Sequence, residues 1–439
     1  MNFDRWRDWY SWMIGALIIL TVIVTAIVQY RSTRPPRAFA LVGLAAGFGI
    51  GGLLFVPAVP RILTALRHFV IAEAPTATSG PFQVTAVNTA LLAPAANDPP
   101  VLVQIWYPAA ANSPPANSVF QSTAPVACAR VMDGPRLPDE RSKFPILLYA
   151  PGNGGVRDEN ASTAAELASH GYVVVAIDDI DRDQRSPTAA DDWQPLNYDF
   201  SSIEAFKTML WTGDRKVRRQ AEKALTALDR LKACADADWR ARIQYDRIGF
   251  FGFSFGGATA AEAGTFDPRV VAVANLDGDL FGRAAFGDLD KPYLIILTKD
   301  AVFPAPRQLQ SPNPKKRFEA ELMARDLREE VRLANRPRGF GFRILESLHE
   351  NLSDQIFKRR FFKSWLLTHP YRVKSIRDAY LLAFFDTYVR DMPSSLLTQL
   401  PSPFPEVEVL KANETWLKEA ATIQVNLPQY RIDPAAPRH

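Results

Sequence analysis

The sequence predicts an α/β domain with a mostly parallel central sheet and helices on both faces, preceded by an N-terminal two-helix transmembrane anchor. Two uncharged apolar runs, each close to the ~20 residues that cross a bilayer, stand near the start of the chain. From about residue 80, short apolar runs alternate with stretches of helical periodicity. We therefore expect an anchor over residues 1–75 and a globular domain over residues 80–439.

The predicted anchor comprises spans at about residues 12–29 and 38–59. A cleaved signal peptide is the alternative for the first run, but the second run follows it directly. The arginines between the runs favour a cytoplasmic loop, whereas arginines on the outer side of each run oppose this orientation. The arginines of the loop predict a two-pass protein of the cell membrane with an extracytoplasmic globular domain. Gly43, Gly47 and Gly51 share one helix face, which can pack against the first span or against a second copy in a homodimer.

The globular domain contains eight strand candidates. They are residues 82–87, 101–107, 145–150, 172–178, 247–252, 270–276, 293–298 and 341–347. From residue 145 onwards these runs are apolar throughout and rich in β-branched residues, as parallel strands buried on both faces should be. Residues 216–233 carry apolar side chains on one helical face and predict an amphipathic helix between two of these strands.

The composition argues against several kinds of partner and cofactor. A net charge of +4 over 439 residues gives no reason to expect nucleic acid. Cys128 and Cys234 are too few for a disulfide framework or a zinc site, and the sequence does not show whether they pair. The glycine-rich residues 152–155 lack the spacing of a dinucleotide-binding loop. We therefore expect neither a metal nor a cofactor.

Ser254 is the candidate nucleophile. It is the serine of a G-x-S-x-G sequence, "GFSFG", which follows an apolar strand and precedes a helix of small residues. This strand–turn–helix context is what a nucleophile elbow requires, because the sharp turn lifts the hydroxyl above the end of the sheet. The alternative is a non-catalytic serine in a glycine-rich turn. The strand before Ser254 and the helix after it favour the catalytic interpretation.

A serine nucleophile needs a base and an acid elsewhere in the chain. His349 follows the last strand candidate, where the base of a Ser–Asp–His hydrolase falls in chain order. His369, the other downstream choice, is better explained as a helix-end residue. Asp277 and Asp300 end successive strand candidates, and spacing alone leaves the acid open between them. Asp279 is a weaker third candidate.

An oxyanion hole needs backbone N–H groups aimed at the developing negative charge. Phe255, the residue after the nucleophile, is expected to supply one. The loop after the strand at 145–150 is expected to supply the other, with Asn153 as the donor.

Together these residues resemble the platelet-activating-factor acetylhydrolase-like branch of the α/β-hydrolases, over roughly residues 80–410. The markers are "SGPFQV", "VQIWYPA", "FPILLYAPGNGG", "ASHGYVVVAIDD", "GFSFGGATAAEA", "DPRVVAVANLDGDLFG", "SLHENLSD", "YLLAFFDTYVRD" and "PFPEVEV". The resemblance implies the α/β-hydrolase fold, places the acid at Asp277 within an L-D-G motif, and places an oxyanion donor at Asn153. Phe253 and Pro151 depart from the family pattern at positions that shape the pocket.

The resulting hypothesis is a membrane-anchored serine esterase that cleaves small-molecule or lipid carboxylic esters through an acyl-enzyme. An acyltransferase would use the same residues. A catalytically silent membrane-tethered binding protein is the alternative that is not an enzyme.

One aromatic segment, at 191–211, is either a lid over the site or a packing segment. Its aromatic residues are Trp193, Tyr198, Phe200, Phe206 and Trp211.

Overall fold

The computed structural model describes residues 77–92, 99–110, 136–138, 143–179, 194–359 and 368–423. The chain divides into two compact units, Met1–Ile71 and Ala72–His439, and every described residue lies in the second. The predicted membrane spans at 12–29 and 38–59, with the Gly43, Gly47 and Gly51 face, lie outside the described residues and stay predictions. Among the residues that are described, no helix has both the length and the apolar character needed to cross a bilayer.

A nine-stranded sheet forms the centre of the described domain, with the spatial order β1-β2-β4-β3-β5-β6-β7-β8-β9. The strands are β1 (Gln83–Leu91), β2 (Val101–Ala109), β3 (Phe144–Ala150), β4 (Val173–Ile177), β5 (Ile243–Phe253), β6 (Val270–Leu276), β7 (Tyr293–Leu297), β8 (Gly339–Ile344) and β9 (Val407–Val409). The six strands from β4 to β8 in this order run parallel, and β1, β2 and β9 pair antiparallel with their neighbours.

All eight predicted strands are present, and the predicted α/β architecture is confirmed. The ninth strand, β9, was not predicted because it is only three residues long. It is recognised by its pairing, in which Val407 lies opposite Ile344 and Val409 opposite Phe342. Short edge strands of this kind leave little periodicity in a sequence.

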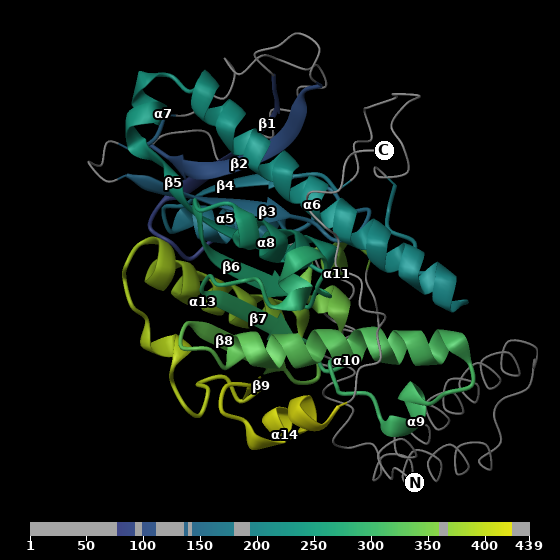
Figure 1. Cartoon of the computed structure of the whole chain (residues 1–439). Coiled ribbons are helices and arrows are strands. Elements are labelled where there is room, and N and C mark those ends of the chain that lie inside the picture. Colours follow the sequence, from purple (N-terminus) through teal and green to yellow (C-terminus); the bar gives the residue numbers. More distant parts are fainter. Residues whose placement is uncertain are drawn as a thin grey trace, which may run out of the picture. The chain divides into compact units, whose positions relative to one another are not determined.

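Helices cover both faces of the sheet (Figure 1). One face is covered by α6 (Ile203–Cys234), α7 (Ala237–Arg242), α8 (Phe255–Phe266), α10 (Pro314–Ala334) and α14 (Glu414–Thr422). The other face is covered by α5 (Ala161–Ser169) and α13 (Pro370–Val389). The remaining described helical segments are η2 (Gly282–Phe286), α9 (Pro306–Leu309), η3 (His349–Leu352), α11 (Gln355–Arg359) and η4 (Ser395–Leu397).

The helix predicted at 216–233 is part of the longer α6, which has 32 residues. Ser202 caps its first turn, because its side chain accepts a hydrogen bond from the Ala205 N–H. The first two turns of α6 therefore lie within the aromatic segment that was expected to be a lid or a packing segment.

Candidate active site

The parallel strands bring the candidate site residues to one edge of the sheet. Ser254 directly follows β5 and Asp277 directly follows β6. The last residues of these neighbouring strands, Phe253 and Leu276, lie opposite each other. The Ser254 N–H donates to the Leu276 carbonyl at 2.9 Å. Because the carboxyl ends of parallel strands meet at one edge, this is where an α/β sheet places a binding site.

Ser254 occupies a strained turn between β5 and α8. Its φ is 53° and its ψ is −125°, in the region of positive φ that side-chain-bearing residues rarely adopt. Glycine is required on both sides. A Cβ on Gly252 would lie 2.1 Å from the Gly256 carbonyl carbon, and one on Gly256 would lie 2.0 Å from the Ala150 carbonyl oxygen. The local sequence thus produces the backbone geometry of a nucleophile elbow.

Asp277 holds His349 through a direct hydrogen bond. His349 Nδ1 and Asp277 Oδ2 are 2.8 Å apart. Thr298, at the end of β7, donates to the same carboxylate twice, from its N–H to Oδ1 and from its hydroxyl to Oδ2, each at 2.8 Å. Sequence reasoning missed Thr298, although its position as the last residue of the strand candidate at 293–298 was a usable signal.

His349 lies at the first position of η3, partly exposed, with its ring against Phe253 at a centroid distance of 4.6 Å. Burial by itself would lower the pKa of His349. The hydrogen bond that His349 donates to Asp277 and the nearby negative charges of Asp277, Asp279 and Glu350 outweigh burial and raise the pKa of His349 above its ordinary value. None of the described residues hydrogen-bonds the Ser254 hydroxyl. Such bonds often tighten only when substrate is bound.

Two backbone N–H groups beside Ser254 have no hydrogen-bond partner within the described part of the chain: those of Phe255 and Asn153. Phe255 is the first residue of α8, where helical N–H groups lack an intrahelical acceptor. Asn153 belongs to the loop after β3, whose Gly152 lies so close that a Cβ on it would be 3.4 Å from the Ser254 Cβ. The structure therefore leaves two donors next to the candidate nucleophile.

The Asn153 side chain fixes its loop against the segment at 194–200. Its Nδ2 donates to the Leu196 carbonyl at 2.8 Å, and its Oδ1 accepts from the Leu196 N–H at 2.6 Å. Gly152 N donates to the buried carboxylate of Glu159 at 2.6 Å. These contacts orient the loop before any substrate arrives.

None of the other acid and base candidates, all of which the structure describes, makes a hydrogen bond to the His349 ring, which is bonded to Asp277. Asp300 is exposed and makes no hydrogen bond to His349. Asp279 hydrogen-bonds the Tyr198 hydroxyl, and burial raises its pKa. His369 accepts from the Tyr371 N–H at the start of α13, which agrees with its interpretation as a helix-end residue.

Within the aromatic segment, Phe200 and Phe206 are buried against Phe255 and Phe281 in one hydrophobic cluster. Trp211 is 46% exposed, and Trp193 lies outside the described residues. The two buried rings support the packing interpretation for their part of the segment.

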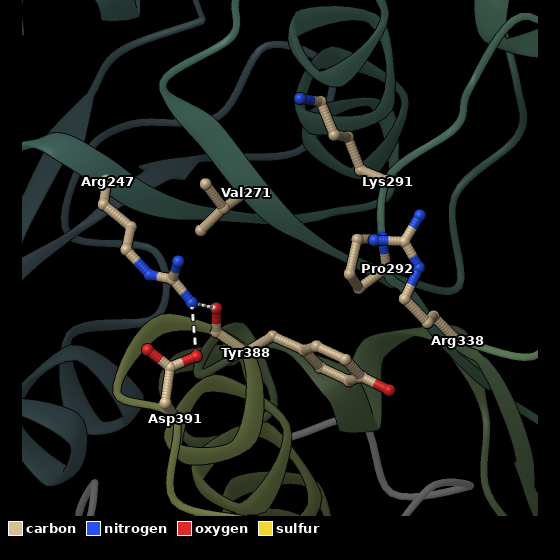
Figure 2. A pocket seen from close by; sticks show the side chains of 7 residues that line it. All are labelled: Arg247, Val271, Lys291, Pro292, Arg338, Tyr388 and Asp391. Carbon is tan, nitrogen blue, oxygen red and sulfur yellow. Dashed lines mark hydrogen bonds and ion pairs between the residues drawn. The ribbon is translucent and has the colours of Figure 1, made fainter.

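A separate cavity of about 350 Å³ lies at the opposite edge of the sheet, near the starts of the parallel strands (Figure 2). Arg247, Lys291 and Arg338 line it. Arg247 is already bound to Asp391 at 2.6 Å and to the Tyr388 carbonyl at 2.8 Å. None of the candidate site residues lines this cavity, so it is distinct from the site at the carboxyl edge.

Comparison with known proteins shows which family the chain resembles. Residues 111–301 match the family model described as platelet-activating factor acetylhydrolase, isoform II. Ser254, Asp277 and Asn153 fall within that span, and His349 lies beyond it. A solved structure of a ferulic acid esterase from Streptomyces cinnamoneus is similar to the chain, with 23% identity and a TM-score of 0.51. The similarity covers 76% of this chain and 98% of the esterase. These findings confirm the resemblance and the α/β-hydrolase fold.

Proposed function

We propose that the chain is a serine hydrolase that cleaves carboxylic esters through a Ser254–His349–Asp277 triad and an acyl-enzyme. The family match supports the coarser statement, a carboxylic ester hydrolase with this fold. The observation that carries the finer one is the Asp277–His349 hydrogen bond at the sheet edge where Ser254 stands in its strained turn.

Acylation begins with proton transfer from Ser254 Oγ to His349 Nε2, since Nδ1 is engaged with Asp277. The oxygen attacks the ester carbonyl carbon and forms a tetrahedral intermediate. The Phe255 and Asn153 N–H groups donate to its oxyanion, and Asp277 stabilises the imidazolium. His349 then gives its proton to the departing alcohol oxygen, which leaves an acyl-Ser254 ester.

Deacylation repeats the sequence with water as the nucleophile. His349 takes a proton from water, the hydroxide oxygen attacks the acyl carbon, and the carboxylic acid leaves as His349 returns the proton to Ser254. An alcohol in place of water would make the protein an acyltransferase, so analysis of the products distinguishes the two reactions.

The proposed substrate class is an acetylhydrolase-like ester, with a short or modified acyl chain and a small-molecule or lipid alcohol. Phe253 supports an apolar site wall, because its ring lies against His349 and a Cβ on Gly152 would be 3.3 Å from its edge. An apolar surface there favours hydrocarbon over charged groups.

The proposed location is the cell membrane, with the two-pass anchor at residues 1–75 and the hydrolase domain outside the cytoplasm. The arginines between the two predicted spans favour this orientation. Labelling of intact cells with a membrane-impermeant fluorophosphonate should then mark Ser254. Labelling only after lysis would contradict this location.

The direct test is hydrolysis of p-nitrophenyl esters over a series of acyl chain lengths, with Ser254→Ala as the control. We expect the parent to prefer the short chains and the variant to lose all but ~10⁻⁴ to 10⁻⁶ of the parent kcat. Parent-level turnover by Ser254→Ala would refute the mechanism. A folded parent with no turnover of any ester would instead support a silent binding protein.

A further inference from the structure

Asp179 and Lys216 form a fully buried ion pair beside the proposed oxyanion hole. Lys216 Nζ lies 2.9 Å from Asp179 Oδ2, and the two side chains are 2% and 0% exposed. Asp179 follows β4 by two residues and Lys216 lies within α6. Charged side chains are almost never fully buried without a specific partner, and the proposed reaction uses neither of them.

The pair is bonded to both segments that border the oxyanion hole. Asp179 Oδ2 accepts from the Gly154 N–H at 2.6 Å, and the Asp179 N–H donates to the Gly155 carbonyl at 3.2 Å. Lys216 Nζ also donates to the Gln194 carbonyl at 2.9 Å. The ion pair thus joins the loop of Asn153, which carries one oxyanion donor, to the segment at 194–200.

Lys216 also contacts the residue that carries the second donor. Its Nζ lies 5.5 Å from the centroid of the Phe255 ring, within the range of a cation–π contact. The Asp179 carboxylate is itself supported by Gln220 on α6, whose Nε2 donates to Oδ1 and, at 2.7 Å, to the Asp179 carbonyl.

We propose that Asp179 and Lys216 are positioning residues that set the direction of the Asn153 N–H in the oxyanion hole, an inference that rests on the proposed function. Hydrogen bonds hold the chain on both sides of the Asn153 N–H. The next residue, Gly154, is tied to Asp179, and the Asn153 side chain is tied to Leu196. Lys216 in turn holds Gln194, two residues before Leu196.

Releasing the pair frees the Gly154 N–H and the Gln194 carbonyl together. The Asn153 donor is then no longer held at the point where the oxyanion forms. A misplacement of about 1 Å can cost about 100-fold in rate. The loss should fall on kcat, because the oxyanion exists only in the transition state and the tetrahedral intermediate.

The test replaces both charges at once, with the double variant Asp179→Leu/Lys216→Met. Single replacements would leave one buried charge unpaired and destabilise the fold, whereas a buried ion pair is often replaced by apolar residues without loss of stability. The matched control is Asp386→Leu/Arg390→Met. Its partly buried pair, 3.1 Å apart, lies at the carboxyl end of α13.

Turnover is measured with the preferred p-nitrophenyl ester, normalised by titration with a fluorophosphonate so that only folded enzyme is counted. We expect kcat of the double variant to fall about 10- to 100-fold with KM within about twofold. The rate of inactivation by an organophosphate, which also needs the oxyanion hole, should fall in parallel. The control variant should keep its kcat within about twofold of the parent.

A folded double variant with parent kcat and parent inactivation rate would overturn the inference. If that variant does not fold, Asp179→Asn/Lys216→Gln decides. It removes both charges while keeping polar side chains of similar size, and unchanged kcat and inactivation rate in this folded variant would show that the ion pair is only structural. Failure of the proposed function is distinguishable, since either Ser254→Ala would retain activity or the folded parent would turn over no ester, whatever the double variant does.

Discussion

Replacing Asp277 by asparagine exchanges one carboxylate oxygen for an NH₂ group and tests whether Asp277 controls the tautomer of His349. The three hydrogen bonds to Asp277 determine the orientation of the asparagine amide that replaces it. Oδ1 faces the Thr298 N–H, which can only donate, so the asparagine carbonyl oxygen must stay there. The NH₂ group then takes the place of Oδ2, facing the Thr298 hydroxyl and His349 Nδ1.

The expected magnitude follows from this geometry. An NH₂ group can only donate, so His349 Nδ1 must become the acceptor and its proton must move to Nε2. A protonated Nε2 cannot take the Ser254 proton, and the stabilisation of the imidazolium by a negative charge is lost as well. For such a change we expect a fall of about 10⁴-fold in kcat, equivalent to about 5.4 kcal/mol in the activation free energy.

The assay is p-nitrophenyl ester hydrolysis near pH 8, with circular dichroism to verify the fold. Asp300→Asn is the matched control, since Asp300 is the exposed acid at the end of the next strand. We expect it to keep kcat within about twofold of the parent. Loss of turnover in Asp300→Asn with turnover retained in Asp277→Asn would refute the assignment of the acid.

Three further outcomes are expected. Because His349 must be neutral to act as base and its pKa is raised, kcat/KM should fall with decreasing pH through a midpoint above 6.5. A midpoint below 6.5 would contradict this. Thr298→Val keeps the backbone donor to Asp277 but removes the hydroxyl, so kcat should fall about 3- to 30-fold, and an unchanged value would show that the backbone N–H suffices. Burial raises the pKa of Glu262 to about 7 from 4.5, so its folded form binds a proton more tightly than its unfolded form. Its contribution to stability is therefore full below pH 4.5 and is lost as pH rises to 7, by up to about 3 kcal/mol. Urea titrations of Glu262→Gln should lack this decline relative to the parent.

Local sequence was sufficient to predict the parts of the site that depend on local backbone. The turn at Ser254 forms because Gly252 and Gly256 are the residues that fit between β5, α8 and the loop after β3. The buried strands could be predicted for a similar reason, since each is a continuous apolar run of the length that spans a sheet. Both patterns can be recognised from residues adjacent in the chain, although the close contact of Gly256 with Ala150 is seen only in the structure.

The choice of the acid that hydrogen-bonds His349 depended on the tertiary structure. Asp277 and Asp300 each end a strand, and nothing in their spacing separates them. The resemblance favoured Asp277, and the fold brings it to His349 because Thr298, directly after β7, holds the Asp277 carboxylate while Asp300 is exposed to solvent. That selection depends on how the ends of three successive strands, β6, β7 and β8, meet in space.

By itself, the sequence determined the class of fold, the strand–turn–helix at Ser254 and the shortlist of acids and bases, because apolar periodicity and turn chemistry are local. The tertiary structure alone decided that Lys216 and Asp179 meet beneath the loop of Asn153. In the sequence, Lys216 is one of many charged residues in an amphipathic helix, with no mark of its burial. A pair across β4 and α6 arises only when the helix packs on the sheet, since the attraction between two charges depends on their distance in space and on the exclusion of water between them.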